Sequence, residues 1–284
     1  MQAKILTKHN FLRELKNFVE SLSERISAND EWAMRGVIDI FRKIYPLPSD
    51  TKVVSKILEL HLFPYFLSFA KDINFSLELA EHQNWYPDLT FVSKENSMIK
   101  FAVDLKTTYR DEKNPNFCNG FTLGSHGEYF VDRKSKKNVQ YPYGEYLAHF
   151  CVGIIYTRKA QFSKEEIQSF SVENLSKIPA VAKDFVIFAE EKWKIAADNQ
   201  GSGNTANIGS IKCIEDIVAG KGVFSLAGEE LFDEYWVNFG KLKVPDKKGG
   251  YKALSTFEEF LIFKGLPLNW NCPKRSKKQS ASDE

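Results

Sequence analysis

The fold is decided by residues 98–109, whose sequence is MIKFAVDLKTTY. Apolar side chains occupy every second position of this stretch, at Ile99, Phe101, Val103 and Leu105. A period of two is typical of a β-strand with one buried face. The opposite face then carries Asp104 and Lys106, so the pattern predicts a strand that holds a carboxylate next to an ammonium.

A second acid, Asp88, lies sixteen positions before Asp104 and follows Pro87 at the head of another apolar run. Proline suits the first residue of a strand because it cannot donate a ladder hydrogen bond. Two nearby carboxylates repel each other, and Mg²⁺, a hard cation that prefers oxygen ligands, relieves that repulsion. Such an ion lowers the pKa of bound water and stabilises charge on a phosphate, while Lys106 can orient the water. The trio indicates phosphodiester hydrolysis; the alternative is a plain Asp–Lys ion pair in an ordinary α/β protein.

The spacing of Pro87-Asp88 and Asp104-x-Lys106 resembles the signature of the PD-(D/E)xK nuclease superfamily. Within that superfamily, the chain is similar to the EcoRV-type type II restriction endonucleases in separate blocks that occur in the same order. The blocks are residues 44–53, 86–88, 104–109, 121–124, 156–158 and 201–210. The similarity runs from about Gly36 to about Trp236.

The resemblance implies an α/β, restriction-endonuclease-like fold, with a central mixed β-sheet flanked by helices. We expect a single endonuclease domain over residues 1–272, in which residues 36–46 form a short extended segment of a small dimerisation subdomain. Loops 81–88 and 201–207 would read the DNA. Residues 273–284, rich in lysine and serine, would form a disordered basic tail.

The resemblance also implies roles for particular side chains. Asp88 and Asp104 would bind Mg²⁺, Lys106 would position or activate water, and Glu59 would be a third acid near the metal. Glu59 belongs to a polar stripe on a predicted helix, together with Lys52, Ser55 and Lys56, and such a stripe is usually only solvated. The resemblance places Lys52 near the scissile region of the DNA.

Other positions would contact DNA by the same resemblance. Gln83 and Asn84 match a loop that approaches the minor groove, although the preceding His82 departs from the family pattern. The remaining matches are Thr108, Lys137 in a basic cluster, and Arg158 at the end of an apolar run. Residues 125–128 depart from the family pattern, so no phosphate contact is carried over there.

The stretch Gly201-Ser202-Gly203-Asn204-Thr205 is a complete match to the family loop that reads the major groove. Two glycines allow backbone groups to reach base edges, and asparagine can pair with adenine. Asn207 would support this loop. Without the resemblance, the segment would be interpreted as a flexible loop, since it lacks the ending of a P-loop and the spacing of a dinucleotide fingerprint.

Composition sets broad limits. The chain of 284 residues has a net charge of only +2, so DNA binding requires a local basic groove, and composition alone favours a protein without a nucleic-acid partner. Four cysteines without C-x-x-C spacing favour reduced thiols. No apolar run approaches the roughly 20 residues that cross a bilayer. We therefore expect a cytoplasmic protein with no membrane segment.

Hydrophobic spacing predicts further elements. Residues 11–26 fit one amphipathic helix, and a helix capped by Ser49 or Asp50 should bury Val53, Val54, Ile57, Leu58 and Leu60 before Pro64 bends or interrupts it. Residues 145–156 predict a helix and then a strand, with His149 as a core histidine. Residues 185–189 and 193–196 predict strands, and residues 257–263 a helix.

The expected function is that of a homodimeric type II restriction endonuclease. It would hydrolyse double-stranded DNA with Mg²⁺, at GATATC, by a blunt central cut that leaves 5′-phosphate and 3′-hydroxyl ends. A cognate DNA methyltransferase in the host is implied. The alternatives are a repair or structure-selective nuclease on the same fold, and a catalytically inactive DNA-binding module.

Overall fold

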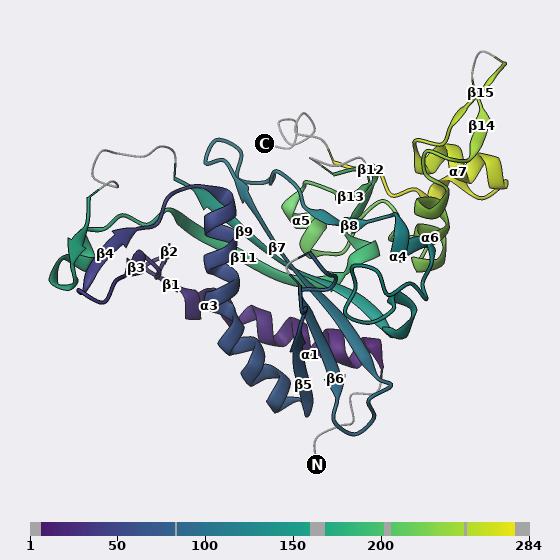
Figure 1. The fold of residues 1–284 in the computed structure, drawn as a ribbon. Helices are drawn as coiled ribbons and strands as arrows, with labels where there is room; N and C mark the ends of the chain where they lie inside the picture. The colour runs from purple at the N-terminus through teal and green to yellow at the C-terminus, as the bar shows by residue number, and fades with distance from the viewer. Residues whose placement is uncertain (1–6, 83, 160–167, 202–205, 247–248, 276–284) are drawn as a thin grey trace.

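The structure is a computed structural model that describes residues 7–82, 84–159, 168–201, 206–246 and 249–275. Its centre is a seven-stranded sheet in the order β1-β2-β11-β9-β7-β6-β5 (Figure 1). The strands are β1 Ser27–Ala28, β2 Glu31–Trp32, β5 Phe75–Leu79, β6 Leu89–Ser93, β7 Lys100–Arg110, β9 Ala148–Arg158 and β11 Ala182–Glu191. Strands β7 and β9 are parallel, whereas the other neighbours are antiparallel. The mixed sheet and the strand predicted over 98–109 are therefore confirmed.

Three helices cover one face of this sheet: α1 Lys8–Glu20, α2 Leu22–Ile26 and α3 Thr51–Asp72 (Figure 1). The apolar face of β7 packs against them, and the Phe11 ring of α1 stacks on Phe101 and Phe150 at centroid distances of 4.2 and 5.4 Å. The single helix predicted over residues 11–26 is divided at Ser21, whose backbone N–H caps the end of α1.

Helix α3 corrects three details of the sequence interpretation. Asp50 is the N-cap, as predicted, but Pro64 does not end the helix. Tertiary packing on both sides of the proline keeps the helix continuous, because its buried stripe contains Val54, Leu58 and Leu62 before Pro64, and Phe66, Phe69 and Ala70 after it. Val53 and Leu60 lie off this stripe and are exposed.

By length and composition alone, α3 could cross a membrane. Its buried stripe packs against the sheet instead, which is the arrangement of a core helix.

The other face of the sheet supports a second layer. A small sheet consists of β8 Thr122–Ser125, β12 Ala196–Gln200 and β13 Asn207–Ser210. Around it lie α4 Glu128–Val131, α5 Ile214–Val218, α6 Glu229–Asn238, α7 Phe257–Lys264 and the hairpin of β14 Lys243–Pro245 and β15 Tyr251–Ala253 (Figure 1). A second apolar core, which includes Ala102 of β7 and Cys151 of β9, fills the space between. Each face of β7 therefore meets its own core.

Short 3-10 helices connect these elements: η1 Tyr143–Glu145, η3 Val172–Lys177, η4 Lys192–Lys194 and η5 Leu268–Trp270. The prediction of a strand over 193–196 is wrong at its start, because residues 193 and 194 belong to η4 and β12 begins only at Ala196. The helix predicted over 257–263 is confirmed as α7.

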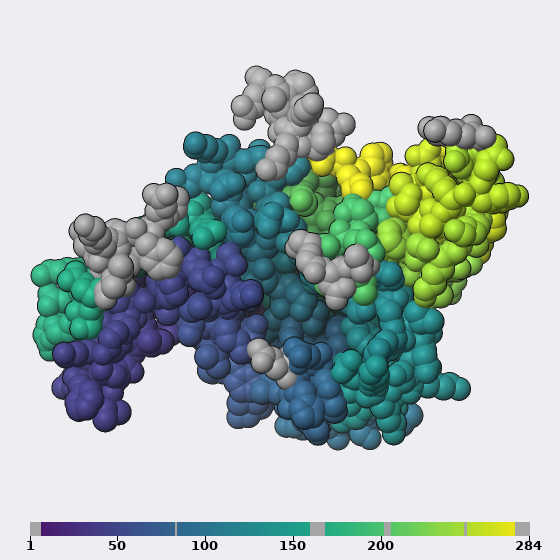
Figure 2. All heavy atoms as spheres, turned by 45° about the horizontal axis from the view of Figure 1, so that its top comes forward, coloured from purple at the N-terminus to yellow at the C-terminus, as the bar shows by residue number. Residues whose placement is uncertain are grey.

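A separate three-stranded sheet contains β3 Gly36–Ile38, β4 Lys43–Pro46 and β10 Phe170–Ser171. The single extended segment predicted over residues 36–46 is in fact a hairpin, because the Asp39 carboxylate accepts hydrogen bonds from the backbone N–H groups of Phe41 and Lys43 and closes the turn. This part of the chain lies at the opposite end of the molecule from the C-terminal helices (Figure 2).

The tail predicted for residues 273–284 falls largely outside the described residues. At its start, Lys274 forms an ion pair with Asp198 at 2.6 Å, and Arg275 forms one with Glu215 at 2.7 Å.

Candidate active site

The position of Asp88 follows from where β6 begins. Leu89, the first residue of β6, pairs with Val103 of β7, so the next part of β7 has no strand partner on that side. The Asp88 carboxylate supplies the hydrogen-bond acceptor that a neighbouring strand would otherwise provide. Its Oδ2 accepts a hydrogen bond from the Leu105 backbone N–H at 2.8 Å. This contact brings Asp88 beside the polar face of β7.

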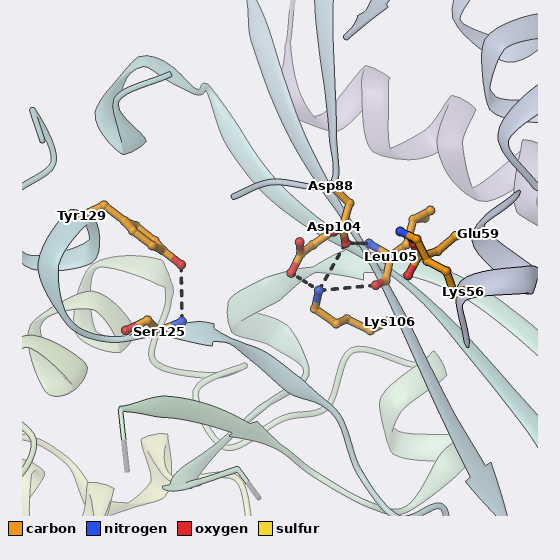
Figure 3. A network of polar contacts seen from close by, with 8 residues as sticks. All are labelled: Lys56, Glu59, Asp88, Asp104, Leu105, Lys106, Ser125 and Tyr129. Atoms are coloured by element: carbon orange, nitrogen blue, oxygen red, sulfur yellow. Dashed lines mark hydrogen bonds and ion pairs between the residues drawn. The ribbon is translucent and has the colours of Figure 1, made fainter. Parts of the chain in front are cut away.

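Lys106 joins the two acids. Its Nζ lies 2.8 Å from Asp104 Oδ2 and 3.3 Å from Asp88 Oδ2 (Figure 3). Asp104 is buried against Cys151, its partner on β9, whereas the side chains of Asp88 and Lys106 are partly open to solvent. The sequence-predicted trio is therefore brought together by a backbone contact and two ion pairs.

The two charges on β7 affect each other's titration. Burial raises the pKa of Asp104 to about 6 against the opposing attraction of Lys106, and the nearby Asp88 charge adds to the rise. Burial by itself would lower the pKa of Lys106, but the charges of Asp104 and Asp88 outweigh it and raise that pKa. Lys106 is therefore a permanent cation here, whereas burial makes the ionised form of Asp104 unfavourable.

A cavity of about 350 Å³ opens over these groups. Asp88, Asp104 and Lys106 line it together with Asn84 and Asn207. Asn84 belongs to the segment 81–88, and Asn207, the first residue of β13, ends the segment 201–207; the sequence singled out both segments for DNA reading. Carboxylate oxygens beside an open cavity are donors that suit a hard divalent cation, whose charge would favour the ionised form of Asp104 that burial disfavours.

Glu59 approaches from the other side. It lines a second cavity of about 340 Å³ with Asp88, Lys106 and Thr108. Its carboxylate, however, is paired with Lys56 of the same helix at 2.6 Å (Figure 3). Among the described residues, no three His, Cys, Asp or Glu side chains are grouped closely enough to hold a metal ion.

The other residues predicted to contact DNA lie on several different elements of the fold. Lys137 forms an ion pair with Glu128 at 2.7 Å, the Arg158 guanidinium lies over the Tyr109 ring at 5.4 Å, and Lys52 is exposed at the start of α3. The Gly201 backbone N–H donates to the carbonyl of Asn207 at 2.9 Å, which joins the two ends of the segment predicted to read the major groove. Gln83, Ser202, Gly203, Asn204 and Thr205 lie outside the described residues.

Several residues around the cavity were not predicted as site residues. Ser125, Glu128 and Tyr129 line it, and the Tyr129 hydroxyl accepts a hydrogen bond from the Ser125 backbone N–H at 3.4 Å (Figure 3). His149 is a buried core histidine, as expected, with its Nδ1 2.9 Å from the Tyr86 hydroxyl. Residues 125–128 depart from the family pattern, and this departure is the only feature of the sequence that distinguishes this part of the cavity wall.

Comparison with known proteins agrees with the geometry. The family model described as restriction endonuclease EcoRV matches residues 28–265. A relative from Escherichia coli, the type II restriction enzyme EcoRV, is 39% identical over 212 residues, which cover 74% of this chain and 84% of the relative. The chain therefore belongs to the EcoRV restriction endonuclease family and is a type II restriction enzyme, a hydrolase that cuts DNA at specific sites.

Proposed function

We propose that this enzyme uses Mg²⁺ to cut double-stranded DNA at the centre of GATATC, leaving blunt ends with a 5′-phosphate and a 3′-hydroxyl. The convergence of Asp88, Asp104 and Lys106 on a cavity that Asn84 and Asn207 also line is the observation that carries the proposal. It joins a hydrolytic centre to both loops expected to read DNA. The complete match of residues 201–205 to the family loop, and the membership of the EcoRV family, support the choice of sequence.

In this mechanism Asp88 and Asp104 would hold the ion, and Glu59 would be a further oxygen ligand if its carboxylate parted from Lys56. When bound, Mg²⁺ lowers the pKa of a water molecule and places positive charge next to the phosphate. Because the pKa of Lys106 is raised, its ammonium keeps its proton, donates hydrogen bonds that orient the attacking water, and offsets charge on the phosphate.

Further side chains hold the substrate. Lys52, Thr108, Lys137 and Arg158 contact the phosphate backbone, which fixes the register of the duplex without reading its sequence. Lys137 must exchange Glu128 for a phosphate to do so. The exposed lysines thus supply the local positive surface that a chain of net charge +2 requires.

A homodimer would present one active site to each strand of a palindromic site. The β3–β4 hairpin fits as the contact between subunits, because Ile38, Ile40 and Phe41 are 61, 90 and 77% exposed there. We place the enzyme in the cytoplasm, where a cognate methyltransferase would protect host DNA, and assign it no membrane partner.

The test is digestion of a plasmid that carries one GATATC site, with Mg²⁺ and with EDTA, followed by sequencing of the ends. A single blunt cut that depends on Mg²⁺ is the expected result. Cuts at a different sequence would refute the assigned specificity, and DNA that is bound but never cut would refute the catalytic roles. Asp104→Ala is the matched control, which should bind the duplex without cutting it.

A further inference from the structure

The 3-10 helix η4 places two lysines in opposite surroundings. Lys194 is partly exposed and pairs with Glu191 at 2.8 Å. Lys192 is only 4% exposed, and its ammonium finds no hydrogen-bond partner among the residues that the structure describes. A buried ammonium without a hydrogen-bond partner is costly in folding free energy, so its position requires a reason.

Aromatic rings surround the Lys192 ammonium. Its Nζ lies 5.4 Å from the ring centroids of Tyr86 and Phe130 and 5.5 Å from that of Tyr143. The negative face of each ring attracts a cation but does not neutralise it. Burial lowers the pKa of Lys192 to about 8, and the charges of Asp104 and Asp233 offset only part of that effect.

The ammonium lies directly behind the wall of the active-site cavity. Gly124 lines that cavity with a backbone φ of +90°, and a Cβ added there would be 3.5 Å from Lys192 Nζ and 3.4 Å from the Tyr129 hydroxyl. Tyr86 and Tyr129, which also line the cavity, form the rest of the wall. A glycine backbone and two rings therefore separate Lys192 from the space above Asp104.

We propose that Lys192 is a second cation of the active site, which acts through the cavity wall to attract the DNA phosphate toward Asp88 and Asp104 and to stabilise the charge that develops during hydrolysis. The inference rests on the proposed function. Lys106 is already paired with both acids, whereas Lys192 forms no ion pair within the described part of the chain, so its field extends into the cavity. The same field repels a divalent cation when no DNA is present.

The test compares Lys192→Met with Lys194→Met. Both variants remove an ammonium from the same short helix, and methionine keeps most of the length and the apolar stem of lysine. In the control variant Lys194→Met, Glu191 keeps its ion pair with Lys8, whose Nζ lies 2.9 Å from the Glu191 carboxylate. Three quantities are measured for each purified full-length protein: the affinity for a short GATATC duplex in EDTA, the affinity for Mn²⁺ without DNA, and stability in urea.

Lys192→Met should weaken duplex binding about tenfold and strengthen Mn²⁺ binding several-fold, since one charge acts on ligands of opposite sign. It should also unfold at higher urea concentration than wild type, because a buried unpaired charge is removed. Lys194→Met should change neither affinity by more than about twofold, as expected for a partly exposed ion pair.

Weaker binding of both ligands, or a less stable Lys192→Met protein, would mean that Lys192 is only a packing residue and would overturn the proposal. Unchanged affinities would overturn it too, because the charge would then not reach the cavity. If wild-type protein fails to cut at GATATC, the proposed function is wrong, but Mn²⁺ binding and stability still decide whether Lys192 acts on the site.

Discussion

Asparagine in place of Asp104 is expected to stabilise the metal-free protein while it abolishes cleavage. Burial raises the pKa of Asp104 from 3.8 to about 6, and this value already includes the attraction of Lys106. At 1.36 kcal/mol for each pKa unit, the ionised carboxylate costs the folded state about 3 kcal/mol at pH 8. Asparagine has the same shape without the charge, so Asp104→Asn should raise the free energy of unfolding by about 2–3 kcal/mol at that pH.

The pH dependence fixes the sign of this effect. Between pH 4 and 6 the folded protein binds more protons at Asp104 than the unfolded chain does, because its folded pKa is the higher one. The stability that Asp104 contributes is therefore complete below about pH 4 and is lost as the pH rises through 6. The gain from Asp104→Asn should be near zero at pH 4 and full at pH 8.

Urea unfolding in EDTA at several pH values measures this gain, and Glu31→Gln is a control of opposite sign. A hydrogen bond from Lys159 lowers the pKa of Glu31, so its stabilisation is present above pH 4.5 and is lost as the pH falls through the lowered pKa. Glu31→Gln should thus lose stability at pH 8. An Asp104→Asn protein that is less stable than wild type at pH 8, or equally stabilised at both pH values, would refute the reasoning.

Three further outcomes are expected. Mg²⁺ at about 100 times its dissociation constant should stabilise wild type by about 2.7 kcal/mol in thermal unfolding and leave Asp88→Ala unchanged; equal stabilisation of both would remove Asp88 from the metal site. Lys56→Ala should lower the Mg²⁺ concentration needed for half-maximal cleavage, because it frees Glu59, while stability changes by less than about 0.5 kcal/mol; an unchanged Mg²⁺ requirement would argue against Glu59 as a ligand. Phe41→Asp should convert a dimer to monomers in sedimentation velocity, with exposed Leu226→Asp as the control, and a Phe41→Asp protein that stays dimeric would place the interface elsewhere.

Local interactions allowed much of the chain to be predicted. The alternation in residues 98–109 sets which face of β7 is buried, and it places Asp104 and Lys106 together whatever the rest of the chain does. Asp50 caps α3 through hydrogen bonds to Lys52 and Val53, only two and three residues away. Such patterns need only neighbouring residues, which is why sequence alone is sufficient for them.

The rest required the tertiary structure. Asp88 meets Lys106 because β6 begins opposite Val103, and that register depends on pairing between strands rather than on the residues around Asp88. Pro64 stays inside α3 because packing of the helix on the sheet outweighs the tendency of proline to end a helix. Glu59 pairs with Lys56, and the spacing of charged residues in the sequence does not decide whether Glu59 faces that lysine or the two aspartates. Nothing near Lys192 in sequence marks it as buried. Its ammonium is enclosed because residues distant in the chain, Tyr86, Gly124 and Tyr143, close around it when the two layers pack, and that packing also builds the cavity over Asp88, Asp104 and Lys106.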